Sequence, residues 1–163
     1  MAADRATAGG ATADRELRAE IRIGAQPDEV WHALADIRAW PGRSPELTAM
    51  LPLKPGGLRP GQWYVGLNRR KAVLWPTRNV IVEVAPGRTL VWDTRTSGAR
   101  WIFELESTPG GTLLVHRRPV TRRLTLLSRV FARFALGGGT AHADELEHGM
   151  SETLRAIKHA VEG

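Results

Sequence analysis

The end of the chain predicts a long amphipathic helix, and this helix limits what the rest can fold into. Its apolar positions recur every three or four residues, at Leu146, Met150, Leu154, Ile157 and Val161. That spacing places them on one stripe of a helix several turns long. Such a stripe needs an apolar surface to cover it, so we expect the helix to lie against a sheet.

The preceding residues supply that sheet as short segments with a period of two. Glu16–Gly24 alternates strictly between apolar and polar residues, which indicates a half-buried strand. Further strands are predicted at Gln62–Leu67, Thr77–Val84, Thr89–Thr96, Arg100–Leu105 and Thr112–Arg118. Tight turns such as Pro86-Gly87 and Thr108-Pro109-Gly110-Gly111 separate them, which favours an antiparallel meander. Trp63 alternates with its polar neighbours together with Val65 and Leu67, and this face is predicted to point inward. In the next strand Val80, Val82 and Val84 share a face.

Two short helices are expected between the first strand and the others. Gln26-Pro27-Asp28-Glu29 has proline at the first helical position followed by two acids, a typical helix start. Asp36 can cap a second short helix, Ile37–Trp40, which Pro41 and Gly42 end. The proline- and glycine-rich stretch Pro52–Gly61 is predicted to form turns.

The length of 163 residues suits one domain with a sizeable core or cavity. We expect residues 1–14, which are small and polar, to be a disordered tail and residues 15–163 to form the domain. The first residues lack the apolar segment of a secretory signal, and the chain has no cysteine, so we expect a cytoplasmic protein. The net charge of +6 comes from arginines spread along the chain without a recognition motif, so we expect no nucleic-acid partner.

Four stretches in this order resemble the START-like (SRPBCC) superfamily, specifically its bacterial branch labelled polyketide cyclase/dehydrase. They are Gln26–Trp31, Ala35–Pro41, Phe103–Thr112 and the ending Gly149…Leu154…Lys158…Glu162. The resemblance covers about Leu17 to Glu162 and implies an α+β helix-grip fold, also called Bet v 1-like. In that fold a curved antiparallel sheet of six or seven strands surrounds the C-terminal helix. The superfamily includes lipid carriers, quinone binders and aromatase/cyclases, so the resemblance does not specify one function.

A curved sheet covered by one helix can leave an apolar space that side chains do not fill, and such a space favours an apolar guest. The chain has six tryptophans, which are candidates to line it, although ordinary core packing explains each of them equally well. The predicted ligand-binding residues are Trp40, Trp63, Trp75, Trp92, Trp101, Phe103, His116, Phe131, Phe134 and Met150.

His116 alternates with Leu114 and Arg118 in the last strand, whereas Leu113 and Val115 form the competing inward face. If the first face points inward, His116 and Arg118 are polar groups in the cavity that can orient a carbonyl or act in acid–base chemistry. His116, Arg118 and Arg100 are therefore the candidate catalytic residues, against the simpler interpretation that His116 is structural.

The amphipathic segment 121–136 places Leu124, Leu127, Phe131 and Phe134 opposite four arginines, before three consecutive glycines. Three interpretations remain open. The segment is a helix packed on the domain, a lid moving on the glycine hinge, or a peripheral contact with anionic lipid.

No motif predicts a metal or cofactor: the chain has no H-E-x-x-H, P-loop or G-x-G-x-x-G sequence, and His142 and His148 are six residues apart. We therefore predict a carrier or sensor that binds a small hydrophobic molecule such as a polyketide, isoprenoid or lipid. The alternative is an aromatase/cyclase that catalyses aldol condensation or dehydration in the same cavity, and a protein-interaction role is a third hypothesis. The residues alone leave open whether the protein is an enzyme.

Overall fold

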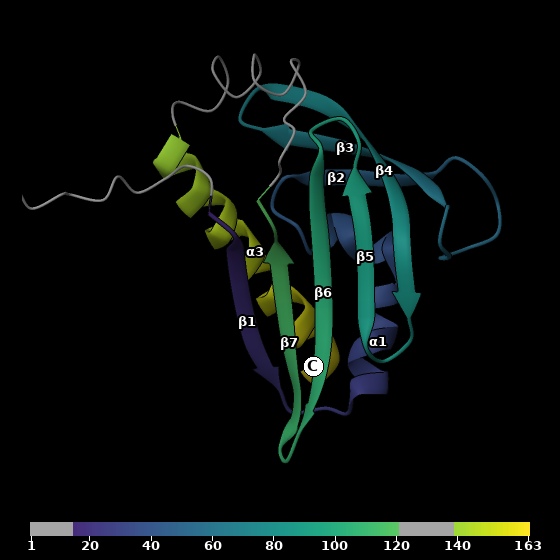
Figure 1. Cartoon of the computed structure of the whole chain (residues 1–163), viewed down its shortest axis with the longest axis vertical. Coiled ribbons are helices and arrows are strands. Elements are labelled where there is room, and N and C mark those ends of the chain that lie inside the picture. Colours follow the sequence, from purple (N-terminus) through teal and green to yellow (C-terminus); the bar gives the residue numbers. More distant parts are fainter. Residues whose placement is uncertain (1–14, 121–138) are drawn as a thin grey trace, which may run out of the picture.

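The computed structural model describes residues 15–120 and 139–163, which form one curved sheet with helices on its concave side (Figure 1). The elements in chain order are β1 (Leu17–Ile23), α1 (Pro27–Ala35), the 3₁₀ helix η1 (Ile37–Gly42), β2 (Leu47–Pro52), β3 (Trp63–Arg70), β4 (Val73–Ala85), β5 (Thr89–Thr94), β6 (Ala99–Thr108), β7 (Gly111–Arg118) and α3 (Gly139–Glu162). The seven strands are antiparallel in the order β1-β7-β6-β5-β4-β3-β2. This is the predicted helix-grip fold.

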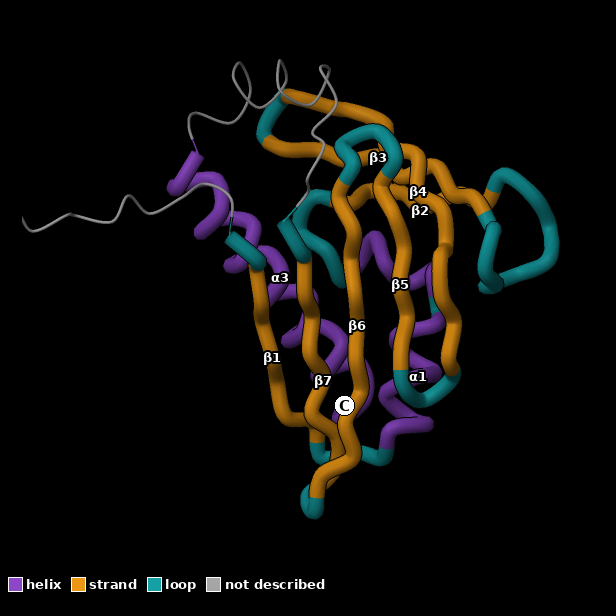
Figure 2. Tube along the Cα trace, in the orientation of Figure 1, coloured by secondary structure: helices purple, strands orange, loops and turns teal. Residues whose placement is uncertain are grey.

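The terminal helix α3 lies along β1 and β7, behind the sheet as Figures 1 and 2 view it. Its predicted stripe is buried: Met150, Leu154 and Ile157 are 3%, 1% and 0% exposed. Polar contacts attach its last turns to the end of β1, because Lys158 Nζ donates to the carbonyl of Arg22 at 2.8 Å. The sheet therefore holds the helix along its length, as the apolar periodicity predicts.

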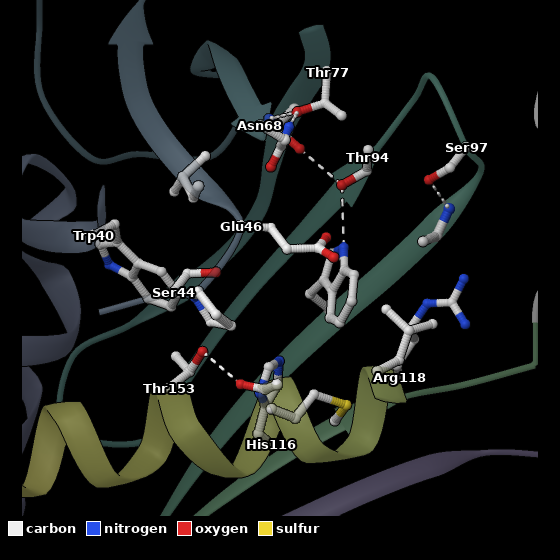
Figure 3. A pocket seen from close by; sticks show the side chains of 18 of the residues that line it. Trp40, Ser44, Glu46, Asn68, Thr77, Thr94, Ser97, His116, Arg118 and Thr153 are labelled. Atoms are coloured by element: carbon white, nitrogen blue, oxygen red, sulfur yellow. Dashed lines mark hydrogen bonds between the residues drawn. The ribbon is translucent and has the colours of Figure 1, made fainter. Parts of the chain in front are cut away.

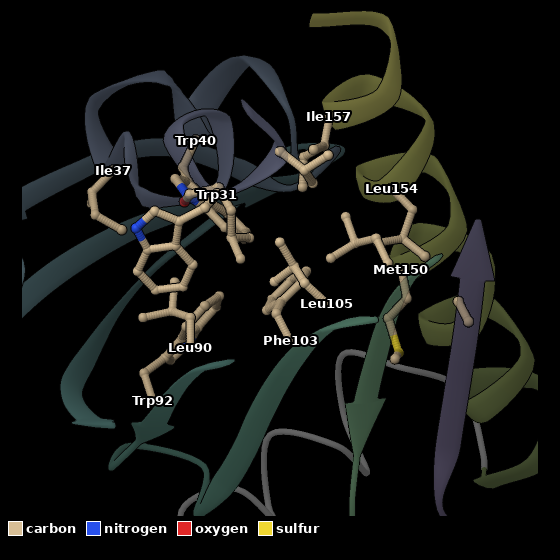
Figure 4. Close-up of a cluster of buried hydrophobic side chains, with 14 of the residues drawn as sticks. Trp31, Ile37, Trp40, Leu90, Trp92, Phe103, Leu105, Met150, Leu154 and Ile157 are labelled. Carbon is tan, nitrogen blue, oxygen red and sulfur yellow. The ribbon is translucent and has the colours of Figure 1, made fainter. Parts of the chain in front are cut away.

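The hydrophobic core lies between the lower part of the sheet and the three helices (Figure 4). Phe103 is fully buried, with its ring stacked on Trp92 at a centroid distance of 5.3 Å and edge-on to Trp40 at 5.3 Å. The indole N–H of Trp40 donates to the carbonyl of Leu34 at 2.9 Å, which joins η1 to α1. These contacts fill one half of the space under the sheet.

Two strands differ from the sequence-based prediction. β2 was not predicted, because its apolar residues precede a proline-rich segment and show no clear alternation. In β3 the inward residues are Tyr64 and Gly66, whereas Trp63 lies on the opposite face and Leu67 is 39% exposed. The predicted inward face of β3 is therefore wrong.

A register shift also interrupts the alternation of β4. Ile81 pairs with Trp92, but Glu83 rather than Val82 pairs with Val91, so the strand carries a bulge between Ile81 and Glu83. Asn79 and Ile81, before the bulge, are buried, whereas Val82, within it, is 39% exposed. A bulge makes the residues after it point to the opposite face from the one that strict alternation predicts. Val80 and Val82 therefore do not face the cavity together with Ile81.

The predicted tail at residues 1–14 and the amphipathic segment 121–136 lie outside the described residues. Within the part of the chain that the structure describes, no helix has the length and apolar character needed to span a membrane.

Candidate ligand-binding cavity

The concave side of the sheet is only partly filled, and a cavity of about 730 Å³ remains between the sheet, η1 and the first half of the described α3 residues. The core around Phe103 closes one end of this space. The other end is bordered by exposed residues, among them Lys71, Val120 and His148, so the cavity opens there toward solvent. The fold thus encloses a space large enough for a small-molecule ligand.

Aromatic and sulfur-containing side chains line much of the wall. Trp92 comes from β5 and Trp101 from β6, where the period-two pattern turns both toward the helix. Trp40 reaches the cavity from η1, and Met50 and Met150 approach it from β2 and α3. Indole rings and thioethers pack well against flat apolar groups, which suits a ring-containing guest.

A chain of hydrogen bonds crosses the upper wall from β6 to β3 (Figure 3). The indole N–H of Trp101 donates to Thr94 Oγ1 at 3.1 Å, and that hydroxyl donates to Asn79 Oδ1 at 2.7 Å. Asn79 Nδ2 and Asn68 Nδ2 both donate to Thr77 Oγ1, at 3.2 and 3.1 Å. These hydrogen bonds join side chains of four neighbouring strands, so this polar strip fixes the shape of the wall.

Sequence reasoning missed the polar strip. Its residues in β4, Thr77 and Asn79, alternate with Ile81, which is a period-two signal on the face opposite the valines. The three valines on the other face make this signal hard to recognise, because an inward face is normally the more apolar one. The strip shows that the inward face of β4 is polar where it lines a cavity.

His116 lies on the inward face of β7, so the first of the two predicted faces is correct. It is 4% exposed, and its ring stacks on Phe103 at a centroid distance of 3.8 Å. Neither ring nitrogen has a hydrogen-bond partner among the described residues. Burial lowers the pKa of His116 to about 3, so the imidazole is neutral at physiological pH.

Arg118 follows on the same face at the open end of the cavity. Its guanidinium carbon lies 5.4 Å from the centroid of the Trp101 ring, a cation–π contact. Burial lowers the pKa of Arg118, yet a guanidinium remains charged at neutral pH. The third candidate, Arg100, is not among the residues that line the cavity and forms an ion pair with Asp93 at 2.7 Å, so the structure does not bring it together with His116 and Arg118.

Three carboxyl groups also line the cavity, those of Glu46, Glu145 and Glu152, and the sequence did not single them out. Glu46 follows η1, and burial raises its pKa, with Glu145 acting in the same direction and Arg70 opposing it. Arg70 itself forms an ion pair with Glu145 across the cavity entrance. Among the residues that the structure describes, no three histidine or carboxylate side chains come close enough together to hold a metal ion.

The predicted binding residues therefore divide into three groups. Those that line the cavity are Trp40, Trp75, Trp92, Trp101, His116 and Met150. Phe103 lies behind His116 in the core, and Trp63 lies on the other face of the sheet. Phe131 and Phe134 are outside the described residues.

The curved sheet, the terminal helix and the partly filled space between them define a helix-grip protein with an internal cavity. The chain belongs to the family described as polyketide cyclase / dehydrase and lipid transport, which it matches over residues 14–162. No curated protein matches its sequence.

Solved structures share the fold at low sequence identity. The KanY protein superposes with a TM-score of 0.69 at 16% identity, covering 92% of this chain and 99% of that one. The di-domain ARO/CYC BexL from the BE-7585A biosynthetic pathway has a TM-score of 0.69 at 21% identity, and the match spans 91% of this chain but 50% of BexL. A Polyketide_cyc-like protein from Corynebacterium glutamicum has a TM-score of 0.60 at 22% identity, covering 90% and 91%. These likenesses establish the fold.

Proposed function

We propose that the protein binds a small, mainly apolar molecule in the cavity between the sheet and α3, as a carrier or sensor. The observation that carries this proposal is the cavity of about 730 Å³ walled by Trp40, Trp92 and Trp101. Its volume lies within the range of about 300–1,000 Å³ typical of small-molecule sites.

The energy available supports this proposal. A guest that buries about 250 Å² of apolar surface gains about 6 kcal/mol at 25 cal/mol per Å². A gain of about 6 kcal/mol alone corresponds to a dissociation constant of about 40 μM. The lost freedom of the guest offsets part of that gain, so we expect a dissociation constant between about 0.1 and 1 mM. The donors of Thr77, Asn79 and Thr94 are already engaged, so the polar strip supports shape recognition in preference to many direct hydrogen bonds.

Binding can be measured with N-phenyl-1-naphthylamine (NPN), an uncharged probe with a naphthyl and a phenyl group that fluoresces in apolar surroundings. Met50 lines the cavity, whereas its neighbour Leu51 is 61% exposed. Met50→Trp should fill part of the space and weaken NPN binding at least tenfold, and Leu51→Trp should leave it within twofold. Urea denaturation of both variants checks that they fold.

Equal binding to wild type and Met50→Trp, with both folded, means that NPN binds elsewhere and overturns the proposal. Native mass spectrometry of protein from its own host is the complementary test. A carrier should release an unmodified small molecule on denaturation, and a protein-interaction module should capture a protein partner without one.

The second candidate function is an aromatase/cyclase that promotes aldol condensation or dehydration. The observation in its favour is Glu46, a carboxyl with a raised pKa in the same cavity as Arg118. A carboxyl of this kind can exchange a proton with the carbon next to a carbonyl. Neutral His116, with a pKa of about 3, is too weak a base for that role.

Incubation with a synthetic poly-β-ketone thioester tests this candidate. Wild type should change the ratio of aromatic products relative to the spontaneous reaction, and Glu46→Gln should return it to the spontaneous ratio while still binding NPN. A product ratio that does not respond to the protein leaves the carrier or sensor as the function.

A further inference from the structure

The inner face of β7 carries two polar side chains whose hydrogen-bonding groups are unused. Both ring nitrogens of His116 and the Nε of Arg118 are buried, and none has a partner among residues 15–120 and 139–163. Both residues line the cavity. Buried polar groups are normally hydrogen-bonded, so two unsatisfied neighbours facing one cavity indicate a place where something else binds.

No carboxylate pairs with Arg118 in the described ranges, and the same holds for Arg69 and Lys71, but those two cavity-lining cations are exposed whereas Arg118 is half-buried. Arg70 is paired with Glu145, and Arg15 is paired with Glu147 at 2.8 Å. Burial alone shifts the pKa of Arg118, with no contribution from a carboxylate. Its positive charge is therefore available to a ligand.

Glu46 does not cancel this charge. The charged groups that shift the pKa of Glu46 are Arg70 and Glu145, which form the ion pair across the entrance. Arg118 is not among them. The cavity thus has a positive side at the end of β7 and a carboxyl on the side of β2. Its far end is apolar, around Trp40 and Trp92.

Trp101 connects the two unsatisfied groups. Its ring centroid is 5.6 Å from that of His116, and its face is the one that Arg118 covers. His116 and Arg118 are two residues apart on β7, so their backbones are about 6.6 Å apart along the strand. This distance is about the size of one substituted six-membered ring. A flat ring beside Trp101 can therefore present one oxygen to each of them.

We infer that the ligand is an apolar acid, a ring-containing molecule whose anionic oxygen group binds Arg118 and whose neighbouring hydroxyl or carbonyl binds His116. Its hydrocarbon part points toward Trp40 and Trp92. Arg118 supplies charge-assisted hydrogen bonds to the anion, and neutral His116 supplies one donor and one acceptor. This inference rests on the proposed binding function and adds the chemical class and orientation of the ligand.

Two probes that differ by one anionic group test the charge preference. ANS (1-anilinonaphthalene-8-sulfonate) is NPN with a sulfonate on the ring system. Arg118→Gln should weaken ANS binding at least tenfold and change NPN binding less than twofold. Arg117→Gln removes the same charge on the opposite face, where Arg117 contacts Glu16 and Glu104, and should leave both affinities within twofold.

A second experiment tests a carboxylate in place of the sulfonate, by measuring how well it displaces bound NPN. For wild type, 2-naphthoate should compete better than its methyl ester, and Arg118→Gln should reverse the order. The inference is overturned if Arg118→Gln leaves ANS binding unchanged, weakens both probes equally, or preserves the preference for 2-naphthoate. If NPN fails to bind wild type at all, the proposed function fails, which is a separate outcome.

Discussion

Replacement of His116 by phenylalanine should make the protein more stable, and the gain should grow as the pH falls. His116 is 4% exposed and has two ring nitrogens without partners among the described residues. Phenylalanine keeps the stack on Phe103 and removes both polar atoms. An unsatisfied buried polar group costs about 1–3 kcal/mol, so His116→Phe should gain roughly that amount at neutral pH.

The pH dependence follows from the pKa of His116, which is about 3 in the folded protein against an ordinary value of 6.5. Between these values the unfolded chain binds a proton that the folded chain does not, so wild-type stability falls as the pH is lowered from 6.5 toward 3. Between pH 7 and pH 5 the loss attributable to this histidine is about 2 kcal/mol. The Phe variant lacks this loss.

Urea denaturation followed by tryptophan fluorescence at pH 7, 6 and 5 measures the difference in unfolding free energy between the two proteins. That difference should widen by about 2 kcal/mol from pH 7 to pH 5. A His159→Gln variant, altered at an exposed position on α3, controls for the loss of one histidine and should follow wild type. A constant difference across this range would refute the reasoning, because His116 would then titrate alike in both states.

Three further predictions concern the core, a turn and the carboxyl of Glu46. Phe103→Ala should lower the unfolding free energy by about 3–5 kcal/mol in urea denaturation, and a loss below 1 kcal/mol would contradict its place in the core. Gly111 has a φ of +135°, and an added Cβ would lie 2.2 Å from the carbonyl oxygen of Ile23. Gly111→Ala should therefore lower the melting temperature through a loss of at least about 1–3 kcal/mol, whereas Gly110→Ala, with open space around it, should change stability by less than about 0.5 kcal/mol. The pKa of Glu46 is raised by burial, so wild-type stability falls as the pH rises through the carboxyl range. Glu46→Gln should be more stable than wild type at pH 7 and lose this advantage below pH 4.5; an advantage that persists there argues against the raised pKa.

The sequence allowed the topology to be predicted because the strongest patterns are local. The stripe Met150, Leu154 and Ile157 indicated which side of α3 is buried, and the alternation around Trp92 indicated the inward side of β5. β3 and β4 were harder. Their inner faces border a cavity, where polar residues such as Asn79 replace the apolar ones that mark a filled core. The bulge after Ile81 added a register change that no spacing rule anticipates.

The site itself was only partly predictable for a related reason. Which of two alternating faces points inward depends on pairing with β1 and β6, so the position of His116 was decided by tertiary structure. Glu46 has no motif around it, and its proximity to the cavity arises from the turn after η1. Arg100 and Arg118 look equivalent in the sequence, but one has Asp93 as its neighbour across the strands and the other has no carboxylate among the described residues.

Two residues of β7 that would help to bind the ligand also lower the stability of the folded protein. An apolar residue at position 116 would pack on Phe103 without leaving unsatisfied nitrogens, and a neutral residue at position 118 would avoid burying a charge. His116 and Arg118 therefore lower stability in the empty protein, and a ligand that hydrogen-bonds to both would restore part of that loss. The same substitution should then act in opposite directions on two measurements. His116→Phe should raise the unfolding free energy and weaken the binding of an apolar acid, which a purely structural histidine would not do.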